Sequence, residues 1–259
     1  MSGYPGLLVP VGHEQPLPRR IRAVLGGVPL VDTVRARYVW EHSRYPWYHL
    51  PLADVADGVL VDEGGPGERV AGRPARRHGL RAGGERRPGA ALVFPEQDAV
   101  RFDWDAVDAW FEEDEQVFVH PRDPYTRVDA LRSGRRVRIE LEGTVLAESP
   151  APVIVFETGL PPRYYLGRTE IDSAVLVPSG TVTACPYKGR TSGYWSARVA
   201  GRVHPDLAWS YDFPTRELQP VAGLVAFYTE RVDVWLDSVA QPRPVTHFVG
   251  PDAAEGAGG

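Results

Sequence analysis

Cysteine, lysine and long apolar runs are scarce in this sequence, and each scarcity excludes a class of protein. The single cysteine, Cys185, cannot form an internal disulfide or supply the several thiolates of a cysteine-rich zinc site. No stretch approaches the roughly 18 uncharged apolar residues that a membrane-spanning helix needs. The N-terminus has no basic start followed by an apolar segment, so no signal peptide is predicted. We therefore expect a cytoplasmic protein with no membrane anchor, metal site or other cofactor.

Basic charge is also in short supply, because the formal net charge is -5 at pH 7. A general nucleic-acid binder needs a basic face to neutralise phosphates, so nucleic acid is disfavoured as a partner. The one basic cluster, from Arg69 to Arg87, mixes seven arginines with glycine and proline. We interpret it as a solvated loop, with a phosphate-binding patch as the alternative. The acidic run from Glu112 to Glu115 is interpreted as a solvated face and not as a metal site.

Glycine and proline are abundant, at 27 and 25 residues of 259, and they divide the chain into short segments that favour strands and turns. A hydrophobic content of 43% is enough to bury real cores. All 29 basic residues are arginine except Lys188. A genome rich in guanine and cytosine would explain the arginines. It does not explain why one lysine is retained so close to the only cysteine.

The sequence repeats itself. The segment RIRAVLGGVPLVDT aligns without a gap with RVRIELEGTVLAES, and the same register pairs Glu41 with Glu157 and Tyr48 with Tyr164. Further along, FDWDAVDAW aligns with FYTERVDVW. Agreement at both ends of a long segment predicts an internal duplication.

The duplication divides the chain into five parts. Residues 1–18 are an N-terminal extension, 19–112 the first repeat, 113–134 a linker, 135–240 the second repeat and 241–259 a flexible tail. The tail ends in DAAEGAGG, which is small, acidic and poor in apolar residues.

Each repeat is predicted to consist of short strands. Residues 136–141 alternate polar and apolar side chains, and Glu142-Gly143 supply a hairpin turn before the return strand. Residues 152–157 are an apolar run that ends in a carboxylate, which indicates a buried strand. Two predictions remain for residues 103–115. The spacing of their aromatic residues favours a helix, whereas the matching segment of the second repeat favours a strand.

Four segments in this order, HPRDPYTRVD, VFETGLPPRYYL, TACPYKG and AWSY, resemble domain-of-unknown-function family 427 in its tandem form. The similarity extends over residues 19–240. It implies a mainly β protein of two tandem β-tent-like domains, each with short antiparallel sheets that meet around a pocket, and few short helices. Several β-tent relatives hold zinc with four cysteines, which this chain cannot do. The family has also been labelled nucleotidyltransferase-like, but neither a Gly-Ser loop with paired aspartates nor a Walker-type lysine loop is present.

A tight turn is predicted from Cys185 to Gly189, because Pro186 presets the backbone angle and glycine tolerates positive φ. The turn would bring Cys185 and Lys188 to one rim. An ammonium close to a thiol favours its reactive thiolate form, and Lys188 could instead form a Schiff base or bind an anion. The structural alternative is a buried, inert cysteine beside a solvated lysine.

A rigid pocket wall is predicted from Glu157 to Tyr165. Glu157 ends the buried strand, and a Gly-Leu-Pro-Pro loop leads to Arg163, Tyr164 and Tyr165. The planar fork of Arg163 suits a carboxylate or phosphate, and Glu157 could act as an acid or base. An ion pair between Glu157 and Arg163 is the structural alternative.

The second repeat carries the better-equipped site. The first repeat retains Glu41, but it has Trp47 in place of Arg163 and neither a thiol nor a lysine at the matching turn. Four aromatic residues also change: Tyr194 and Trp195 align with His78 and Gly79, and Trp209 and Tyr211 with Leu92 and Phe94. The site of the first repeat is therefore predicted to be degenerate, with a weaker anion site at most, formed by His78 with Arg76 and Arg77.

The linker holds an unusual density of titratable side chains: His120, Arg122, Asp123, Tyr125, Arg127 and Asp129. His120 is a candidate for proton transfer. The alternative is that these groups pair with one another and pin the two repeats together.

We predict that the second repeat binds, and chemically transforms, a small anionic planar ligand without a metal. The candidate catalytic residues are Lys188, Glu157, Cys185 and His120. The candidate ligand-binding residues are Arg163, Tyr164, Tyr165, Tyr187, Tyr194, Trp195, Trp209, Tyr211, Arg122, Tyr125 and Arg127. Aromatic residues could stack on a planar ring, although in short strands they are more often core. The alternatives are a module that binds a protein or peptide in an aromatic groove and, less favoured, nucleotide binding or nucleotidyl transfer; no oligomeric state is predicted.

Overall fold

A computed structural model describes residues 9–246, and in it the chain folds as two compact units whose boundary lies between Asp123 and Pro124. Both units are mainly β and antiparallel, with only short 3₁₀ helices in the described residues. The predicted fold class is therefore correct. Of the predicted flexible tail, residues 247–259 lie outside the described residues, and Gln241 belongs to a strand. Within those residues, no helix has the length and apolar character needed to span a membrane.

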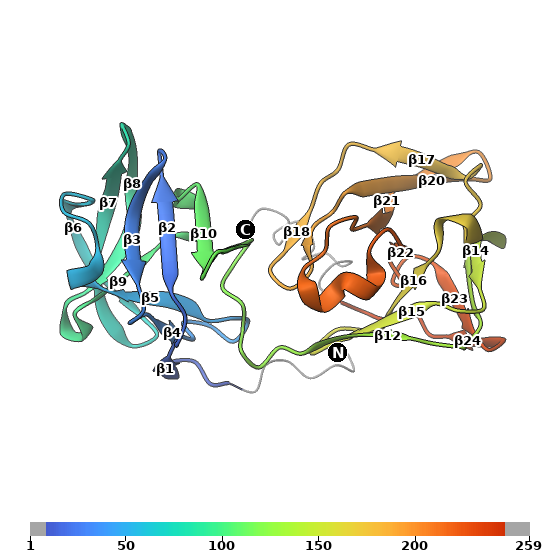
Figure 1. Cartoon of the computed structure of the whole chain (residues 1–259), viewed down its shortest axis with the longest axis horizontal. Helices are drawn as coiled ribbons and strands as arrows, with labels where there is room; N and C mark the ends of the chain where they lie inside the picture. The colour runs from blue at the N-terminus through green and yellow to red at the C-terminus, as the bar shows by residue number, and fades with distance from the viewer. Residues whose placement is uncertain (1–8, 247–259) are drawn as a thin grey trace. The chain divides into compact units, whose positions relative to one another are not determined.

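The N-terminal unit contains a seven-stranded and a four-stranded sheet (Figure 1). In spatial order the larger sheet consists of β1 (Glu14–Pro16), β4 (Arg37–Val39), β5 (Trp47–Pro51), β9 (Ala99–Phe102), β8 (Glu85–Phe94), β7 (Arg73–Ala82) and β6 (Leu60–Val70). The smaller consists of β11 (Glu115–Val117), β10 (Ala109–Glu112), β2 (Ile21–Leu25) and β3 (Val28–Thr33). The short helices are η1 (Leu52–Asp54), η2 (Pro95–Gln97) and η3 (Trp104–Ala106).

The C-terminal unit contains sheets of seven, four and two strands. The largest consists of β12 (Val128–Arg132), β15 (Val153–Glu157), β16 (Arg163–Leu166), β22 (Val225–Phe227), β21 (Arg202–Ser210), β20 (Gly193–Val199) and β17 (Leu176–Ser179). The second consists of β14 (Thr144–Ser149), β13 (Val137–Leu141), β23 (Asp233–Leu236) and β24 (Val239–Gln241). The third is the hairpin of β18 (Ala184–Cys185) and β19 (Gly189–Arg190), and the short helices are η4 (Arg168–Glu170) and η5 (Arg216–Val221).

The two units share one topology. The order β1-β4-β5-β9-β8-β7-β6 corresponds strand by strand to β12-β15-β16-β22-β21-β20-β17, and the four-stranded sheets correspond in the same way. The cross-strand register also matches, since Leu50 faces Val100 in one unit and Leu166 faces Val225 in the other. The hairpin turns are also of one kind. The β2–β3 turn uses Gly26-Gly27 and the β13–β14 turn uses Glu142-Gly143, and all four residues have positive φ. This is the arrangement expected of an internal duplication.

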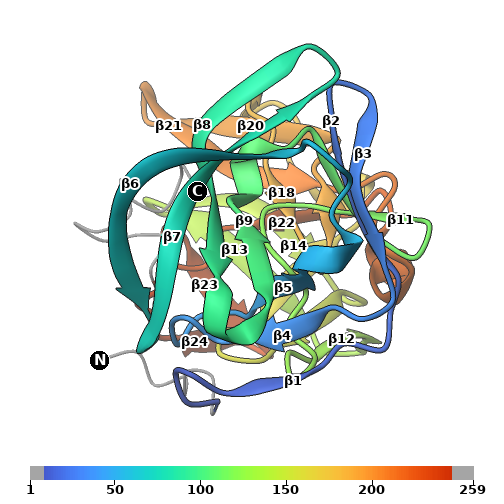
Figure 2. The ribbon, with the colours of Figure 1, turned by 90° about the vertical axis from the view of Figure 1, so that its left-hand side faces the viewer.

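Several sequence-based boundaries and interpretations change in the structure. The predicted N-terminal extension supplies β1, which pairs with β4, and the predicted linker supplies β11 and β12. The segment from Arg69 to Arg87 is not a loop, because it forms the end of β6, all of β7 and the start of β8, long strands that Figure 2 shows curving together. Its arginines pair on the sheet surface with acidic neighbours such as Glu68 and Glu85. Residues 103–115 form η3 and β10, so the open choice is settled in favour of a strand.

The acidic run from Glu112 to Glu115 is only partly solvated. Glu112 is buried, because side chains alternate along β10 and place it on the same inward face as Trp110. Its carboxylate accepts hydrogen bonds from Tyr48 at 2.6 Å, Tyr38 at 3.2 Å and Arg19 at 2.5 Å. The solvated interpretation is therefore wrong for Glu112.

Hydrophobic cores fill the space between the two main sheets of each unit. In the C-terminal unit one buried cluster joins Ile139 and Val234 of the smaller sheet to Ile154, Tyr164 and Leu166 of the larger. There the centre of the space between the sheets, where the resemblance implied a pocket, is filled by packed side chains, and a small pocket remains that is lined by Tyr164 of the larger sheet and Val234 of the smaller. The predicted polar site residues must be sought on the other face of the seven-stranded sheet.

Candidate functional site

The candidate site lies on the outer face of the seven-stranded sheet of the C-terminal unit. Because strand residues alternate between faces, Tyr164 and Leu166 enter the core between the sheets, whereas Tyr165 points the other way. Tyr165 joins a second buried cluster with Tyr194, Trp209 and Tyr211.

Two segments cover this outer face. Helix η5 contributes the fully buried side chains Leu218 and Val221 to the same cluster. The β18–β19 hairpin contributes the predicted turn, with Gly189 at a φ of +93°. The tip is tied to the segment before η5, because Thr215 donates its hydroxyl to the Tyr187 carbonyl at 2.6 Å and its N–H to the Lys188 carbonyl at 3.2 Å. Figure 1 shows η5 as the orange helix beneath β18.

The hairpin tip brings Lys188, Glu157 and Cys185 together. The ammonium of Lys188 donates a hydrogen bond to Oε2 of Glu157, and its Nζ lies 3.7 Å from Sγ of Cys185. The side chains of Lys188 and Glu157 are only 11% and 9% exposed, and Cys185 is partly exposed. The predicted convergence of a lysine, a thiol and a carboxylate is therefore present in the geometry.

The charge state of Lys188 limits its chemistry. Burial opposes the charge, but Cys185, Glu157 and Tyr165 outweigh burial and raise the pKa of Lys188 above its ordinary value. A lysine that forms a Schiff base needs a lowered pKa, so that the neutral amine is available. In this arrangement Lys188 is a permanent cation, which favours anion binding over Schiff-base chemistry.

Aromatic hydroxyl groups belong to the buried cluster on the same face of the sheet. Nε1 of Trp209 donates to the Tyr165 hydroxyl at 3.2 Å, and the hydroxyls of Tyr194 and Tyr228 lie 2.6 Å apart. Burial raises the pKa of Tyr165 to about 12, although Lys188 acts in the opposite direction. Burial, assisted by neighbouring tyrosines, also raises the pKa of Tyr194 and Tyr211. These phenols are therefore neutral at physiological pH and can donate hydrogen bonds.

Arg163 pairs with a carboxylate that the sequence did not suggest. Its guanidinium makes a two-pronged ion pair with Glu230, at 2.5 and 2.6 Å, and also donates to Thr229 at 2.6 Å. The predicted alternative, an ion pair with Glu157, does not form, because Lys188 occupies that carboxylate. Glu230 was missed because it follows β22 and approaches Arg163 only in the folded sheet.

The remaining predicted residues are distributed over both units. Tyr164 and Trp195 pack toward the core between the sheets, away from the Lys188 face. Tyr187 lies at the hairpin tip and supplies its carbonyl to Thr215. The other four lie near the boundary of the units: His120, stacked on Tyr45 at 3.9 Å; Arg122, paired with Glu115; Tyr125, exposed; and Arg127, paired with Asp129.

His120 and Arg122 belong to the N-terminal unit, whereas Tyr125 and Arg127 belong to the C-terminal unit. The hydrogen bond from Nε1 of Trp40 to Asp123, at 3.0 Å, and the ion pair of Arg122 with Glu115 lie within the N-terminal unit, and the ion pair of Arg127 with Asp129 lies within the C-terminal unit. A role for His120 in proton transfer at the Lys188 site stays a prediction.

The N-terminal unit has a different polar set at the corresponding position. Glu41 accepts a hydrogen bond from Nε2 of His49 at 2.8 Å and forms an ion pair with Arg101 at 3.3 Å. His49 corresponds to Tyr165, and Arg101 to Ala226, by the register of their strands. Sequence reasoning missed both residues, because a lone histidine and a lone arginine in apolar strands carry no motif.

The structure also corrects the alignment of two aromatic residues. Across β7–β8, Arg77 faces Leu92 and His78 faces Ala91, whereas across β20–β21, Tyr194 faces Trp209 and Trp195 faces Ala208. Tyr194 and Trp195 therefore correspond to Arg77 and His78, one residue earlier than the sequence alignment placed them. The alignment of Trp209 and Tyr211 with Leu92 and Phe94 is unchanged.

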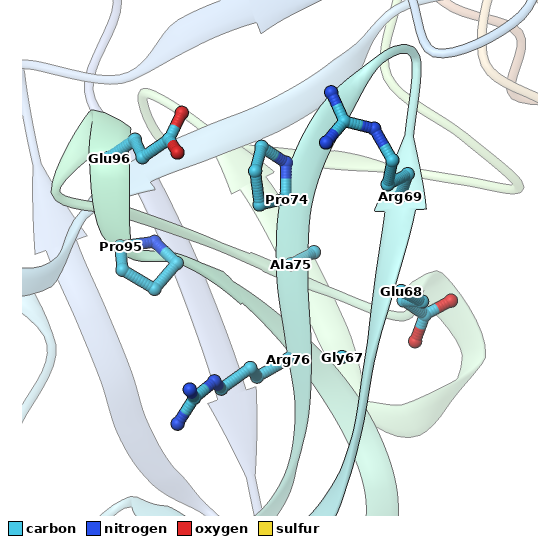
Figure 3. Close-up of a pocket in the computed structure, with 8 residues that line it drawn as sticks. All are labelled: Gly67, Glu68, Arg69, Pro74, Ala75, Arg76, Pro95 and Glu96. Carbon is cyan, nitrogen blue, oxygen red and sulfur yellow. The ribbon is translucent and has the colours of Figure 1, made fainter.

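Two surface pockets lie away from Lys188. The larger, of about 460 Å³, is in the N-terminal unit between β6, β7 and η2, and in Figure 3 Arg76 and Glu96 lie on either side of Pro95. The smaller, of about 160 Å³, is in the C-terminal unit and is lined by prolines together with Tyr164 and Thr229. Among residues 9–246, no group of three or more His, Cys, Asp or Glu side chains is placed to hold a metal ion.

Comparison with known proteins gives a family and no activity. No curated protein matches the chain. The model of the family described as Domain of unknown function (DUF427) matches residues 14–68 and 129–238, well over half of the chain. The matched segments begin at β1 and β12, the corresponding first strands of the two larger sheets. The chain therefore belongs to the DUF427 family.

Proposed function

We propose that the C-terminal unit binds a small planar anion on the outer face of its seven-stranded sheet, with Lys188 as the anchor for the negative charge. The observation that carries this proposal is the position of the only lysine. It is 8% exposed, protonated, and surrounded by a carboxylate, a thiol and aromatic hydroxyls. Nothing in the fold requires a lysine there, because the N-terminal unit builds the same sheet with Arg101 as the cation beside its carboxylate.

The surroundings of Lys188 suit a flat ligand with polar edges. Trp209 and Tyr211 add aromatic surface to the buried cluster on this face, and the hydroxyls of Tyr165 and Tyr194 stay protonated. Binding sites for small molecules combine mostly apolar walls with a few placed polar groups. The same residues are buried, which favours an enclosed small molecule over a peptide in an open aromatic groove.

Charge balance defines how an anion can enter. Lys188 and Glu157 neutralise each other, and leaving a buried charge without a partner is costly. An anion must therefore displace Glu157 from Lys188 or arrive together with a proton. Opening of the β18–β19 hairpin, which is held by Thr215, would give access to both groups.

Chemical transformation of the ligand is the second candidate function. It is supported by Cys185, whose sulfur lies 3.7 Å from Lys188 and remains partly exposed. A thiol beside a fixed cation is a suitable nucleophile, and Glu157 is placed to exchange a proton with a bound molecule.

The test is a thermal-shift screen of small planar anions, such as aromatic carboxylates and nucleoside monophosphates, with wild type and Lys188→Met. Arg101→Met, which removes the corresponding cation of the other unit, is the matched control. We expect a ligand that stabilises wild type and Arg101→Met but not Lys188→Met. The proposal is overturned if every ligand that stabilises both wild type and Arg101→Met also stabilises Lys188→Met. Calorimetry in buffers of different ionisation enthalpy then reports whether a proton is taken up.

A further inference from the structure

A second buried polar network is present in the N-terminal unit, where the sequence indicated only a degenerate site. Its centre is Glu41, which accepts a hydrogen bond from Nε2 of His49 at 2.8 Å and lies 3.3 Å from Nε of Arg101. His49 is 3% exposed and Arg101 6% exposed. The network lies on the sheet face that corresponds to the Lys188 face of the other unit.

The network contains polar atoms without hydrogen-bond partners. In residues 9–246, four buried side-chain nitrogen or oxygen atoms have none, and two of them are Nδ1 of His49 and Nε of Arg101. Nε of Arg101 is close enough to Glu41 for an ion pair, but its N–H does not point along a hydrogen bond. Buried polar groups are almost always paired, so two exceptions in one network indicate a position for a further group.

The two atoms differ in what they require. An ionised carboxylate can only accept, so the Nε2 of His49 that faces Glu41 carries the proton, and Nδ1 is left as an acceptor. Burial lowers the pKa of His49, which keeps the ring neutral and preserves this arrangement at neutral pH. Nε of Arg101 is a donor. A partner molecule must therefore offer a donor to His49 and an acceptor to Arg101.

Aromatic side chains form the outer wall of the network. The guanidinium of Arg101 lies 4.4 Å from the ring centre of Trp47, and Trp47 lies 6.0 Å from Tyr45. Tyr45 in turn contacts His42 at 4.4 Å and stacks on His120 at 3.9 Å. All four rings are partly exposed, so the wall is accessible from solvent. Such a wall suits a planar ring.

We propose that the N-terminal unit has a ligand site of its own, formed by His49, Arg101 and the aromatic wall, that takes a small hydroxyaromatic acid. The acid group accepts from Arg101, the hydroxyl donates to His49, and the ring lies against Trp47 and Tyr45. This site is separate from the Lys188 site and does not depend on it.

The test uses nitrogen NMR of protein labelled at histidine, with the three hydroxybenzoate isomers as probes and benzoate and phenol as matched controls. The Nδ1 signal of His49, assigned by its loss in His49→Gln, should be that of an unprotonated, unbonded nitrogen in the free protein. At least one hydroxybenzoate should move it toward a hydrogen-bonded position. Benzoate should bind about tenfold more weakly, because it leaves a buried acceptor unpaired.

Two variants separate this site from the proposed function. Lys188→Met should respond to the hydroxybenzoate as wild type does, and Arg101→Lys should bind it about tenfold more weakly while keeping a cation for Glu41. The proposal is overturned if Nδ1 is already hydrogen-bonded in the free protein, which would indicate an ordered water alone. It is equally overturned if no isomer moves the His49 signal, whatever the outcome for Lys188.

Discussion

His49 in the N-terminal unit and Tyr165 in the C-terminal unit occupy the same position of corresponding strands. Each faces the first residue of the preceding strand, Arg37 for His49 and Val153 for Tyr165. His49 binds Glu41 directly, whereas in the other unit Lys188 reaches across from a hairpin to bind Glu157. The same sheet architecture therefore supports two polar centres in which the carboxylate has different partners, and each unit can be tested by its own substitutions.

The N-terminal unit should lose stability as the solution becomes acidic below about pH 6.5. Burial lowers the pKa of His49 below the ordinary 6.5, so in that range the unfolded chain binds a proton that the folded chain does not. The stabilisation is complete above pH 6.5 and is lost as the pH falls through the folded pKa. Urea unfolding between about pH 5 and 8 should show a flatter pH dependence in His49→Gln than in wild type.

His42 contributes to the same pH dependence, because burial lowers its pKa as well. The free energy of unfolding should therefore depend less on pH in the double variant, with both His42 and His49 changed to glutamine, than in His49→Gln. If the free energy of unfolding changed with pH to the same extent in wild type and in both variants, the burial argument would be contradicted.

The Arg163–Glu230 pair should be essential to the stability of the C-terminal unit. Its side chains are 7% and 1% exposed, and removing one partner leaves an uncompensated buried charge. Arg163→Met should lower the free energy of unfolding by about 3–5 kcal/mol in urea titrations.

Arg127→Met is the matched control for that experiment. Arg127 pairs with Asp129 at 2.8 Å, but its side chain is 80% exposed, so the loss should stay below about 1 kcal/mol. Similar losses in the two variants would mean that burial does not decide the strength of the Arg163 pair.

Cys185 should react with alkylating reagents in the folded protein, and Lys188 should accelerate the reaction. The attacking species is the thiolate, and the ammonium 3.7 Å away stabilises its charge by about 1 kcal/mol even at the dielectric constant of water. The thiol of Lys188→Met should therefore react more slowly than that of wild type, by a factor of up to about five. Because the chain has one cysteine, mass spectrometry counts the product directly; denatured samples, in which both variants should react alike, are the control.

Gly83→Ala should destabilise the N-terminal unit more than Gly84→Ala. Both residues have positive φ, of 55° and 81°, so both substitutions carry backbone strain, which is greater at Gly84. A Cβ on Gly83 would lie 2.2 Å from the carbonyl oxygen of Gly26, whereas one on Gly84 meets nothing within 4 Å. Thermal unfolding of the pair isolates the contact between the two turns, and equal melting temperatures would show that these turns are not in contact.

Much of the architecture could be predicted from local patterns. Polar and apolar residues alternate in 137–141, glycine-containing pairs mark the hairpin turns, and the aligned halves indicated one topology used twice. Where the two halves differ in hairpin length the alignment slipped, so that Tyr194 was matched with His78 and not with Arg77. A slip of one residue exchanges the faces of a strand, which a sequence comparison cannot detect.

Several residues of the candidate site could be predicted from the sequence, but the partners of its charged side chains could not. The unusual position of the only lysine and the only cysteine pointed to the Cys185–Lys188 turn. The partner of Arg163 was not evident, because Glu230 lies far along the chain and meets it only when β16 and β22 pair. Glu112 was misjudged because an acidic run resembles a solvated surface until strand alternation turns one member inward.

The sequence by itself determined the fold class, many of the strands and turns, and the family, because these depend on residue spacing and on contacts between near neighbours. Only the tertiary structure decided which charges meet. Burial makes each buried carboxylate take a partner, and the choice among the cations depends on how hairpins fold back over the sheet. Lys188 reaches Glu157, and His49 with Arg101 reaches Glu41, for this reason.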